Sequence, residues 1–191
     1  VVVGPDEVVI THGCVDALQM SLRVLTKPGD LIAAESPSYY GLLQLADLLG
    51  LKVIEIPCDP DTGLSLEALQ LAASQWPIKA LVLTARLSNP LGGSVPDGRQ
   101  KQLLKMAANF DIQIVEDDIY GELLFDVGSI RALKSNDTEG RVIYCSSFSK
   151  TISPGVRIGW ILPGRYREEI KRLQTFSTHS ACSVTQMGVA A

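Results

Sequence analysis

Two cations and several hydroxyl side chains stand close together in the segment SSFSKTISPGVRIGW, residues 146–160. Lys150 follows an apolar run, and Arg157 lies seven residues later, beyond a proline-glycine turn. A lysine amine can condense with an aldehyde, and the planar fork of an arginine suits a phosphate. Ser147 and Ser149 add hydroxyl groups that could join the arginine. The segment therefore predicts a site that binds an aldehyde and a phosphate together.

A second group of chemically active side chains lies in EDDIYGEL, residues 116–123. The D-x-x-Y spacing puts the Asp117 carboxylate and the Tyr120 phenol on the same side of one turn. Three carboxylates in a row at the end of a buried strand are costly unless a cation or a proton meets them. The alternative is an acidic loop in water, which we expect for Glu116 or Asp118.

Three further segments follow apolar runs and end in residues that suit a ligand. Gly13, in THGCVDAL, lets backbone approach closely before a helix whose N–H groups and positive dipole end suit a phosphate. A ring at Tyr39 or Tyr40 could lie flat on a planar ligand, and the amide of Asn89 could point into a cleft. The alternatives are a plain glycine turn, core tyrosines, and an Asn-Pro turn with no further role.

The elements that must position these residues alternate along the chain. Helical periodicity is expected over residues 14–25, 39–50, 64–74 and 97–110, with a helical tail from 167. Buried strands are expected over residues 31–34, 51–57, 80–84, 112–117, 142–147 and 157–162. This alternation predicts a three-layer α/β/α fold, with helices on both faces of a mainly parallel sheet. Ligands of such sheets bind where the carboxyl ends of the strands gather.

The strand ends together supply a phosphate cradle, a stacking aromatic, a carboxylate, a phenol and a lysine. This inventory fits pyridoxal 5'-phosphate. Lys150 would form a Schiff base with the cofactor aldehyde, and Asp117 would keep the pyridine nitrogen protonated so that the ring can accept electrons. Tyr120 and Asn89 would donate hydrogen bonds to the ring oxygen and help tune the imine.

Composition excludes several other classes of protein. The net charge of −4 with scattered lysines and arginines does not favour a nucleic-acid surface on this segment. No apolar run approaches the ~20 residues of a membrane span, and no signal peptide is visible. Four distant cysteines without a C-x-x-C pair argue against a metal site or a disulfide framework and suit a reducing cytoplasm. The sequence has no G-x-G-x-x-G or Walker loop after any expected strand, so it does not favour a nucleotide-binding domain.

The chain resembles the class I/II aminotransferases, which are fold type I pyridoxal-phosphate enzymes. The resemblance rests on SNPLG around Asn89, EDDIYGEL with its D-x-x-Y, and SSFSK followed by PGVRIGW, in matching order and spacing. It covers essentially all 191 residues and corresponds to the large cofactor-binding domain. The start without methionine and the end inside a helical pattern predict a fragment, residues 1–191, that lacks an N-terminal segment and a C-terminal small domain.

The resemblance also implies a role for individual residues. It makes Lys150 the Schiff-base lysine and proton shuttle, with Asp117 and Tyr120 as the other catalytic residues. The implied cofactor-binding residues are Gly13, Cys14, Val15, Tyr39, Asn89, Asp117, Tyr120, Ser147, Ser149, Lys150 and Arg157. Many relatives carry a hydroxyl or amide side chain at the helix start, where this chain has Cys14 and Val15. We therefore expect only backbone contact there.

Within the family, THGCVDAL, ESPSYYG, CSSFSK and PGVRIGW look most like the aminotransferase-like domain of MocR-type GntR regulators. Those proteins join an N-terminal winged helix-turn-helix to this domain. The resemblance implies a cytoplasmic regulator that senses an amino acid or amine and binds DNA only through the missing domain. The alternative is a stand-alone aminotransferase acting on an amino acid and a 2-oxo acid.

Whether the protein is an enzyme stays open at this point, because both functions need the same core residues. No activity is expected of residues 1–191 alone. In the family, the arginine for the substrate carboxylate lies in the small domain, and the site is completed at a homodimer interface. Arg86 and Arg131 could substitute for that arginine, but we expect both to be surface residues.

Overall fold

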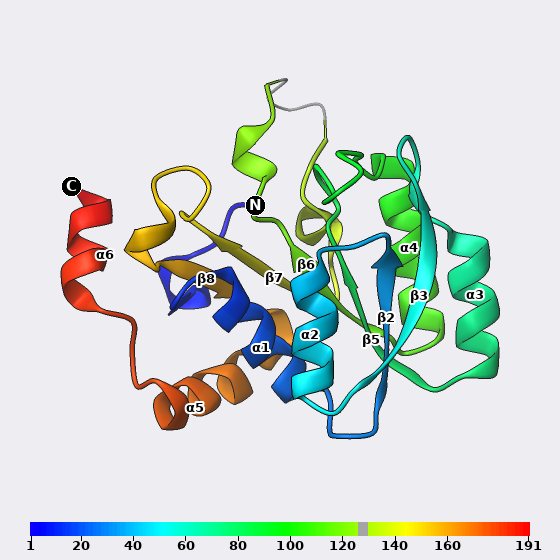
Figure 1. Cartoon of the computed structure of the whole chain (residues 1–191), viewed down its shortest axis with the longest axis horizontal. Helices are drawn as coiled ribbons and strands as arrows, with labels where there is room; N and C mark the ends of the chain where they lie inside the picture. The colour runs from blue at the N-terminus through cyan, green and yellow to red at the C-terminus, as the bar shows by residue number, and fades with distance from the viewer. Residues whose placement is uncertain (126–129) are drawn as a thin grey trace.

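A computed structural model describes residues 1–125 and 130–191 (Figure 1). The strands are β1 (Val9–Thr11), β2 (Leu31–Ser36), β3 (Lys52–Asp59), β4 (Gly63–Leu64), β5 (Ile78–Leu83), β6 (Gln113–Asp117), β7 (Val142–Ser147) and β8 (Gly159–Leu162). The α-helices are α1 (Cys14–Leu25), α2 (Tyr40–Leu48), α3 (Leu66–Gln75), α4 (Asp97–Asn109), α5 (Arg167–Ser177) and α6 (Ser183–Ala190). Short 3₁₀ helices are η1 (Pro5–Glu7), η2 (Gly121–Leu123), η3 (Leu133–Asn136), η4 (Pro154–Val156) and η5 (Gly164–Tyr166).

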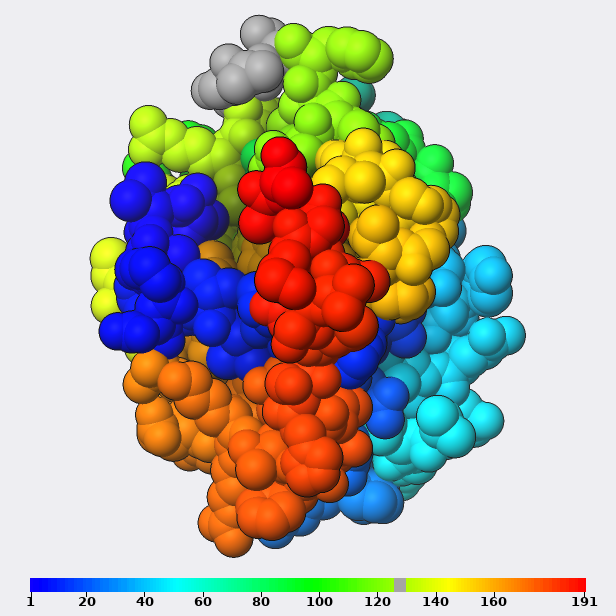
Figure 2. Space-filling model, turned by 90° about the vertical axis from the view of Figure 1, so that its left-hand side faces the viewer, coloured from blue at the N-terminus to red at the C-terminus, as the bar shows by residue number. Residues whose placement is uncertain are grey.

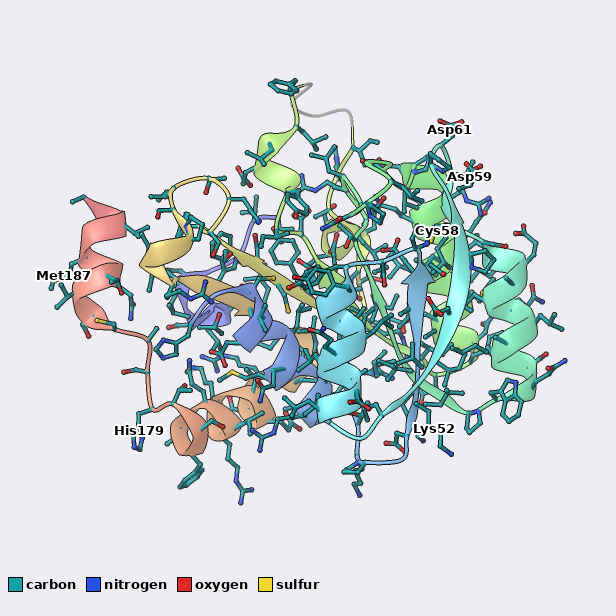
Figure 3. The ribbon with its side chains drawn as sticks, in the orientation of Figure 1. Lys52, Cys58, Asp59, Asp61, His179 and Met187 are labelled. Carbon is teal, nitrogen blue, oxygen red and sulfur yellow. The ribbon has the colours of Figure 1, made fainter. Side chains whose placement is uncertain are left out.

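The strands form one mainly parallel sheet in the order β1-β8-β7-β6-β5-β2-β3-β4. The five central strands β7, β6, β5, β2 and β3 run parallel, whereas β8 is antiparallel to both β7 and β1, and β4 is antiparallel to β3. The carboxyl ends of the parallel strands therefore share one edge of the sheet. Lys52 and Asp59, at the two ends of β3, mark the amino and carboxyl edges in Figure 3.

Helices cover both faces of the sheet, which confirms the predicted three layers. One core cluster joins α1, α2 and α5 to one face, and a second joins α3 and α4 to the other (Figure 1). Alternate strand residues enter the two clusters: Ile32 and Ala34 of β2 pack in the first, and Ala33 packs in the second. This period of two is what a strand buried on both faces requires.

The element boundaries agree with the expected ranges within a few residues, and α1 agrees at both ends. The last strand begins at Gly159 and not at residue 157. Arg157 adopts a left-handed backbone conformation, with φ at 49°, so the chain turns there before it can join the sheet.

The last helix, α6, lies apart from the layered body. It projects at the left of Figure 1, and Figure 2 shows it on the surface that faces the viewer. It contributes no buried residue, and Met187 on it is exposed (Figure 3). Among the described residues, no helix is both long and apolar enough to cross a membrane.

Candidate functional site

The carboxyl edge of the sheet holds a cavity of about 170 Å³. Its lining comprises Cys14, Val15, Leu18, Tyr39, Thr84, Asn89, Asp117, Ile119, Tyr120, Ser149, Lys150 and Arg157. The structure thus gathers nine of the eleven residues singled out in the sequence around one space. The two others, Gly13 and Ser147, do not line the cavity.

Three lining residues were not predicted from the sequence. Leu18 follows Cys14 by one helical turn, so the 3.6-residue period could have placed both on one face. Thr84 directly follows the strand β5, and Ile119 lies inside the D-x-x-Y segment. Their positions near the site could therefore have been predicted from the sequence, but their residue types did not point to a role in binding a ligand.

The start of α1 and Arg157 form a corner suited to an anion. Arg157 Nη2 donates to the carbonyl of His12 at 2.6 Å, and Nη1 donates to Ser149 Oγ at 3.4 Å. Gly13 has a φ of 93°, and a Cβ there would lie 3.0 Å from the Arg157 guanidinium carbon, so only glycine fits. Within the described residues, the N–H groups of Cys14 and Val15 donate no hydrogen bond. This corner offers an anion a guanidinium, a hydroxyl and free helix N–H groups.

Ser147 supports this corner from behind. It is 2% exposed, and its hydroxyl accepts a hydrogen bond from the backbone N–H of Ser149 at 3.3 Å. A direct contact between Ser147 and a phosphate stays a prediction.

At the inner end of the cavity, the Asp117 carboxylate is held by two donors. Cys14 Sγ lies 3.2 Å from Oδ1, and the Ile119 N–H donates to the same oxygen at 3.3 Å. Burial raises the pKa of Asp117 to about 6, although the hydrogen bonds from Cys14 and Ile119 oppose this. Such a carboxylate favours a cationic partner, for example a protonated ring nitrogen. The Cys14 side chain therefore takes part in the site, which the sequence did not predict.

Asn89, Tyr120 and Lys150 meet on another side of the cavity. Asn89 Nδ2 lies 3.3 Å from the Tyr120 hydroxyl, and Lys150 Nζ lies 5.8 Å from the centroid of the Tyr120 ring. Lys150 is exposed at the mouth, and in residues 1–125 and 130–191 its amine has no hydrogen bond or ion pair. The amine is thus near the D-x-x-Y turn and open to a ligand.

Tyr39 and Tyr40 are not core residues. Tyr40 is 69% exposed, and Tyr39 lines the cavity with its ring lying across the backbone of Gly41, where a Cβ would overlap it. The two ring centroids are 5.1 Å apart. Tyr39 is therefore the aromatic ring of this pair that a planar ligand in the cavity would meet.

The expectation of a water-exposed carboxylate at Glu116 or Asp118 is wrong, because both residues are at most 1% exposed. Glu116 accepts hydrogen bonds from the N–H groups of Leu133 and Lys134, at 2.7 and 2.8 Å. Asp118 pairs with Arg86, so the expectation of a surface role for Arg86 is wrong too.

Arg131 is exposed, as expected. No cluster of three His, Cys, Asp or Glu side chains suited to a metal ion occurs in the described part of the chain.

This chain has a mainly parallel sheet between helices, with a lysine, a D-x-x-Y carboxylate and an anion corner at its carboxyl edge. Fold type I pyridoxal-phosphate transferases share this arrangement. Residues 1–191 match the family described as aminotransferase class I and II. The chain belongs to this family.

Individual relatives include both regulators and enzymes. The chain is 47% identical over 189 residues to YjiR of Escherichia coli K12, an uncharacterized HTH-type transcriptional regulator, covering 99% of this chain and 40% of that protein. It is 36% identical to aromatic-amino-acid aminotransferase 1 of Thermococcus litoralis, covering 81% of this chain and 38% of that protein.

A solved structure shares the fold closely. The α-aminoadipate aminotransferase LysN of Thermus thermophilus, in complex with N-(5'-phosphopyridoxyl)-L-leucine, superposes with a TM-score of 0.90 at 31% identity. The alignment covers 98% of this chain and 49% of that one. The chain thus spans less than half the length of each of these three proteins.

A buried carboxyl beside the cavity gives a first testable consequence. Glu35, at the end of β2, is 5% exposed and accepts a hydrogen bond from the Thr84 N–H at 2.8 Å. Burial raises the pKa of Glu35 to about 7 and that of Glu116 to about 8, both from an ordinary value of 4.5. Between about pH 4.5 and 8, the folded chain therefore binds more protons than the unfolded chain, and its stability falls as pH rises.

We expect Glu35→Gln to remove part of this pH dependence, because glutamine does not titrate. The fold should be kept, because the amide oxygen can still accept the Thr84 N–H. Urea unfolding at pH 5 and pH 8, without cofactor, should show a loss of stability on the order of 1–3 kcal/mol smaller in the variant. Equal losses in wild type and variant would contradict the assignment.

Proposed function

We propose that this chain binds pyridoxal 5'-phosphate, attached through Lys150, and is part of the cofactor-binding large domain of a longer protein. The observation that carries the proposal is the meeting of Lys150, Asp117 and the Arg157 corner around one cavity. The donor set matches the group, because an anion corner and a buried carboxylate of raised pKa line the same cavity. We further propose that the protein senses or converts an amino acid or amine.

Different residues of the cavity would bind different parts of the cofactor. Arg157, Ser149 and the first N–H groups of α1 would hold the phosphate. Asp117 would hold the ring-nitrogen proton, and Tyr39 would lie against the ring. When bound, the cofactor supplies an aldehyde that links to amines and a ring that accepts electrons.

The remaining polar residues would orient the cofactor and move protons. The Asn89 amide and the Tyr120 hydroxyl lie within hydrogen-bond distance of each other and would donate to the ring oxygen. Lys150 Nζ, which is open to the cavity mouth, would be the base that takes and returns a proton at the substrate carbon.

For the whole protein we propose a transcriptional regulator of the MocR type in the GntR family. The 47% identity to an HTH-type regulator supports this assignment. We propose that a separate N-terminal domain would bind DNA, that the protein would be cytoplasmic, and that a homodimer would complete the site. The second candidate is a stand-alone aminotransferase, supported by the 36% identity to an aromatic-amino-acid aminotransferase. An upstream basic winged helix in the complete gene favours the regulator, and its absence favours the enzyme.

Selectivity for the phosphate tests the proposed cofactor. We expect the complete protein to bind pyridoxal 5'-phosphate much more tightly than pyridoxal, and Arg157→Gln to reduce this preference by about tenfold or more. Charge-assisted hydrogen bonds of this kind contribute about 1.5–3 kcal/mol. Absorbance titration with the two aldehydes measures both affinities.

Arg131→Gln is the matched control, because Arg131 is an exposed arginine that does not line the cavity. It should leave the preference unchanged. A wild-type protein that binds both aldehydes equally would contradict the proposal that the Arg157 corner binds the phosphate.

A further inference from the structure

A buried ion pair lies next to the cavity but does not line it. Asp118 accepts hydrogen bonds from Arg86, with Nε 3.0 Å from Oδ1 and Nη2 bonded to Oδ2. The Tyr144 hydroxyl donates to Oδ2 at 2.7 Å. The Asp118 side chain is fully buried and that of Arg86 is 15% exposed. Because burial makes an unpaired charge costly, these partners hold each other firmly.

The backbone of Asp118 is fixed to β7. Its N–H donates to the Cys145 carbonyl at 2.9 Å, and its carbonyl accepts from Ser146 Oγ at 3.0 Å. Asp118 is thus anchored to the sheet on its backbone and side chain. The turn that carries Tyr120 begins from this anchored residue.

Arg86 belongs to a loop that is held partly by its own hydrogen bonds. Between β5 and α4, the Leu87 N–H donates to Ser94 Oγ at 3.0 Å and the Val95 N–H donates to the Ala85 carbonyl at 2.8 Å. Leu87 has a φ of 53°, a left-handed conformation that a leucine keeps only when its surroundings hold it there. Arg86 joins this loop to the Asp118 turn.

Gly121 makes room for this tie. A Cβ on Gly121 would lie 2.5 Å from both the Arg86 guanidinium carbon and Asp118 Oδ1. The guanidinium therefore rests on the backbone of the residue that follows Tyr120. Arg86 contacts the turn on both sides of Tyr120.

The same two segments also meet inside the cavity, through the 3.3 Å contact between Asn89 and Tyr120. Asn89 lies three positions after Arg86 along the chain, and Tyr120 lies two positions after Asp118. We propose that Arg86 is a positioning residue: its pairing with Asp118 sets where Asn89 and Tyr120 stand relative to each other. The role at the cofactor rests on the function proposed above, whereas the clamping of the two segments does not.

Three measurements on the complete protein test this role. For Arg86→Met we expect affinity for pyridoxal 5'-phosphate to fall about tenfold or more. The pH midpoint of the bound cofactor's absorbance should shift by about half a unit or more, because Asn89 and Tyr120 no longer hold the ring oxygen in place. Without cofactor, amide hydrogen exchange in residues 84–95 and 117–121 should accelerate.

Two other variants keep the test decisive. Tyr144→Phe removes one hydrogen bond to Asp118 and leaves the ion pair, so it should give smaller effects in the same direction even if Arg86→Met fails to fold. Arg86→Lys keeps the charge without the fork and should restore part of the affinity.

The matched control is Arg141→Met, which breaks a pair of 2.9 Å between Arg141 and Asp111 at the amino edge of the sheet. It should change stability and leave the absorbance midpoint unchanged.

The outcomes separate the two proposals. If wild type binds no pyridoxal 5'-phosphate, the proposed function fails, and hydrogen exchange in the two segments still tests the clamp. If Arg86→Met and Tyr144→Phe lower only the unfolding temperature, as Arg141→Met does, the positioning role is overturned. Unchanged exchange in both segments would overturn the clamp itself.

Discussion

Lys150→Ala should abolish the attachment of pyridoxal 5'-phosphate that borohydride reduction traps on the complete protein. The variant should also lose any turnover of amino acids by roughly 10²–10⁴-fold, the usual contribution of a positioned acid-base group. The reason is that this substitution removes the amine that lines the cavity, 5.8 Å from the centroid of the Tyr120 ring. Absorbance spectra and intact mass after reduction measure the attachment.

The effect should be chemical and not structural. Lys150 is exposed at the cavity mouth, so thermal unfolding of the variant without cofactor should match wild type. Lys101→Ala, at an exposed position on α4, should keep full attachment. A Lys150→Ala protein that retains the reduced adduct at wild-type level would contradict the assignment.

Asp117→Asn should weaken binding of pyridoxal 5'-phosphate by about 10-fold to 100-fold. A hydrogen bond to a charged group contributes about 1.5–3 kcal/mol, and each 1.4 kcal/mol is a factor of ten. Asparagine keeps an oxygen for Cys14 and Ile119, so the change removes the charge and little else. Equilibrium titration of the apo protein measures the affinity.

The pH dependence gives this prediction its control. The pKa of Asp117 without cofactor is raised to about 6, chiefly by burial. Acidification below about pH 6 should therefore protonate Asp117 and weaken binding in wild type, whereas the asparagine variant should lack this dependence. Equal affinities of the two proteins at pH 8 would refute the pairing of Asp117 with the ring nitrogen.

Most of the fold could be predicted from the sequence, because local patterns dictate it. The 3.6-residue rhythm of residues 14–25 and the short apolar runs of the strands each name an element and its buried faces. The late start of β8 was missed because it depends on one left-handed residue, Arg157. A left-handed arginine has no local sequence signal, and its conformation goes with contacts to His12 and Ser149.

The site was predictable where a residue type reveals its chemistry, as for Lys150 and the D-x-x-Y pair. It was not predictable where the partner is distant in sequence. Arg86 and Asp118 are separated by 32 positions, and Cys14 and Asp117 by 103, so neither contact could be read from spacing. The sequence therefore predicts which residue types belong to the site, and only the fold shows which of them are in contact.

The central claim is that a single amine, Nζ of Lys150, carries the cofactor. Peptide mapping by mass spectrometry, after the complete protein is saturated with pyridoxal 5'-phosphate and reduced with borohydride, locates the modified lysine directly. We predict a phosphopyridoxyl group on the peptide that contains Lys150 and on no other peptide at comparable yield. The claim is contradicted if the label is found on other lysines while the Lys150 peptide stays unmodified.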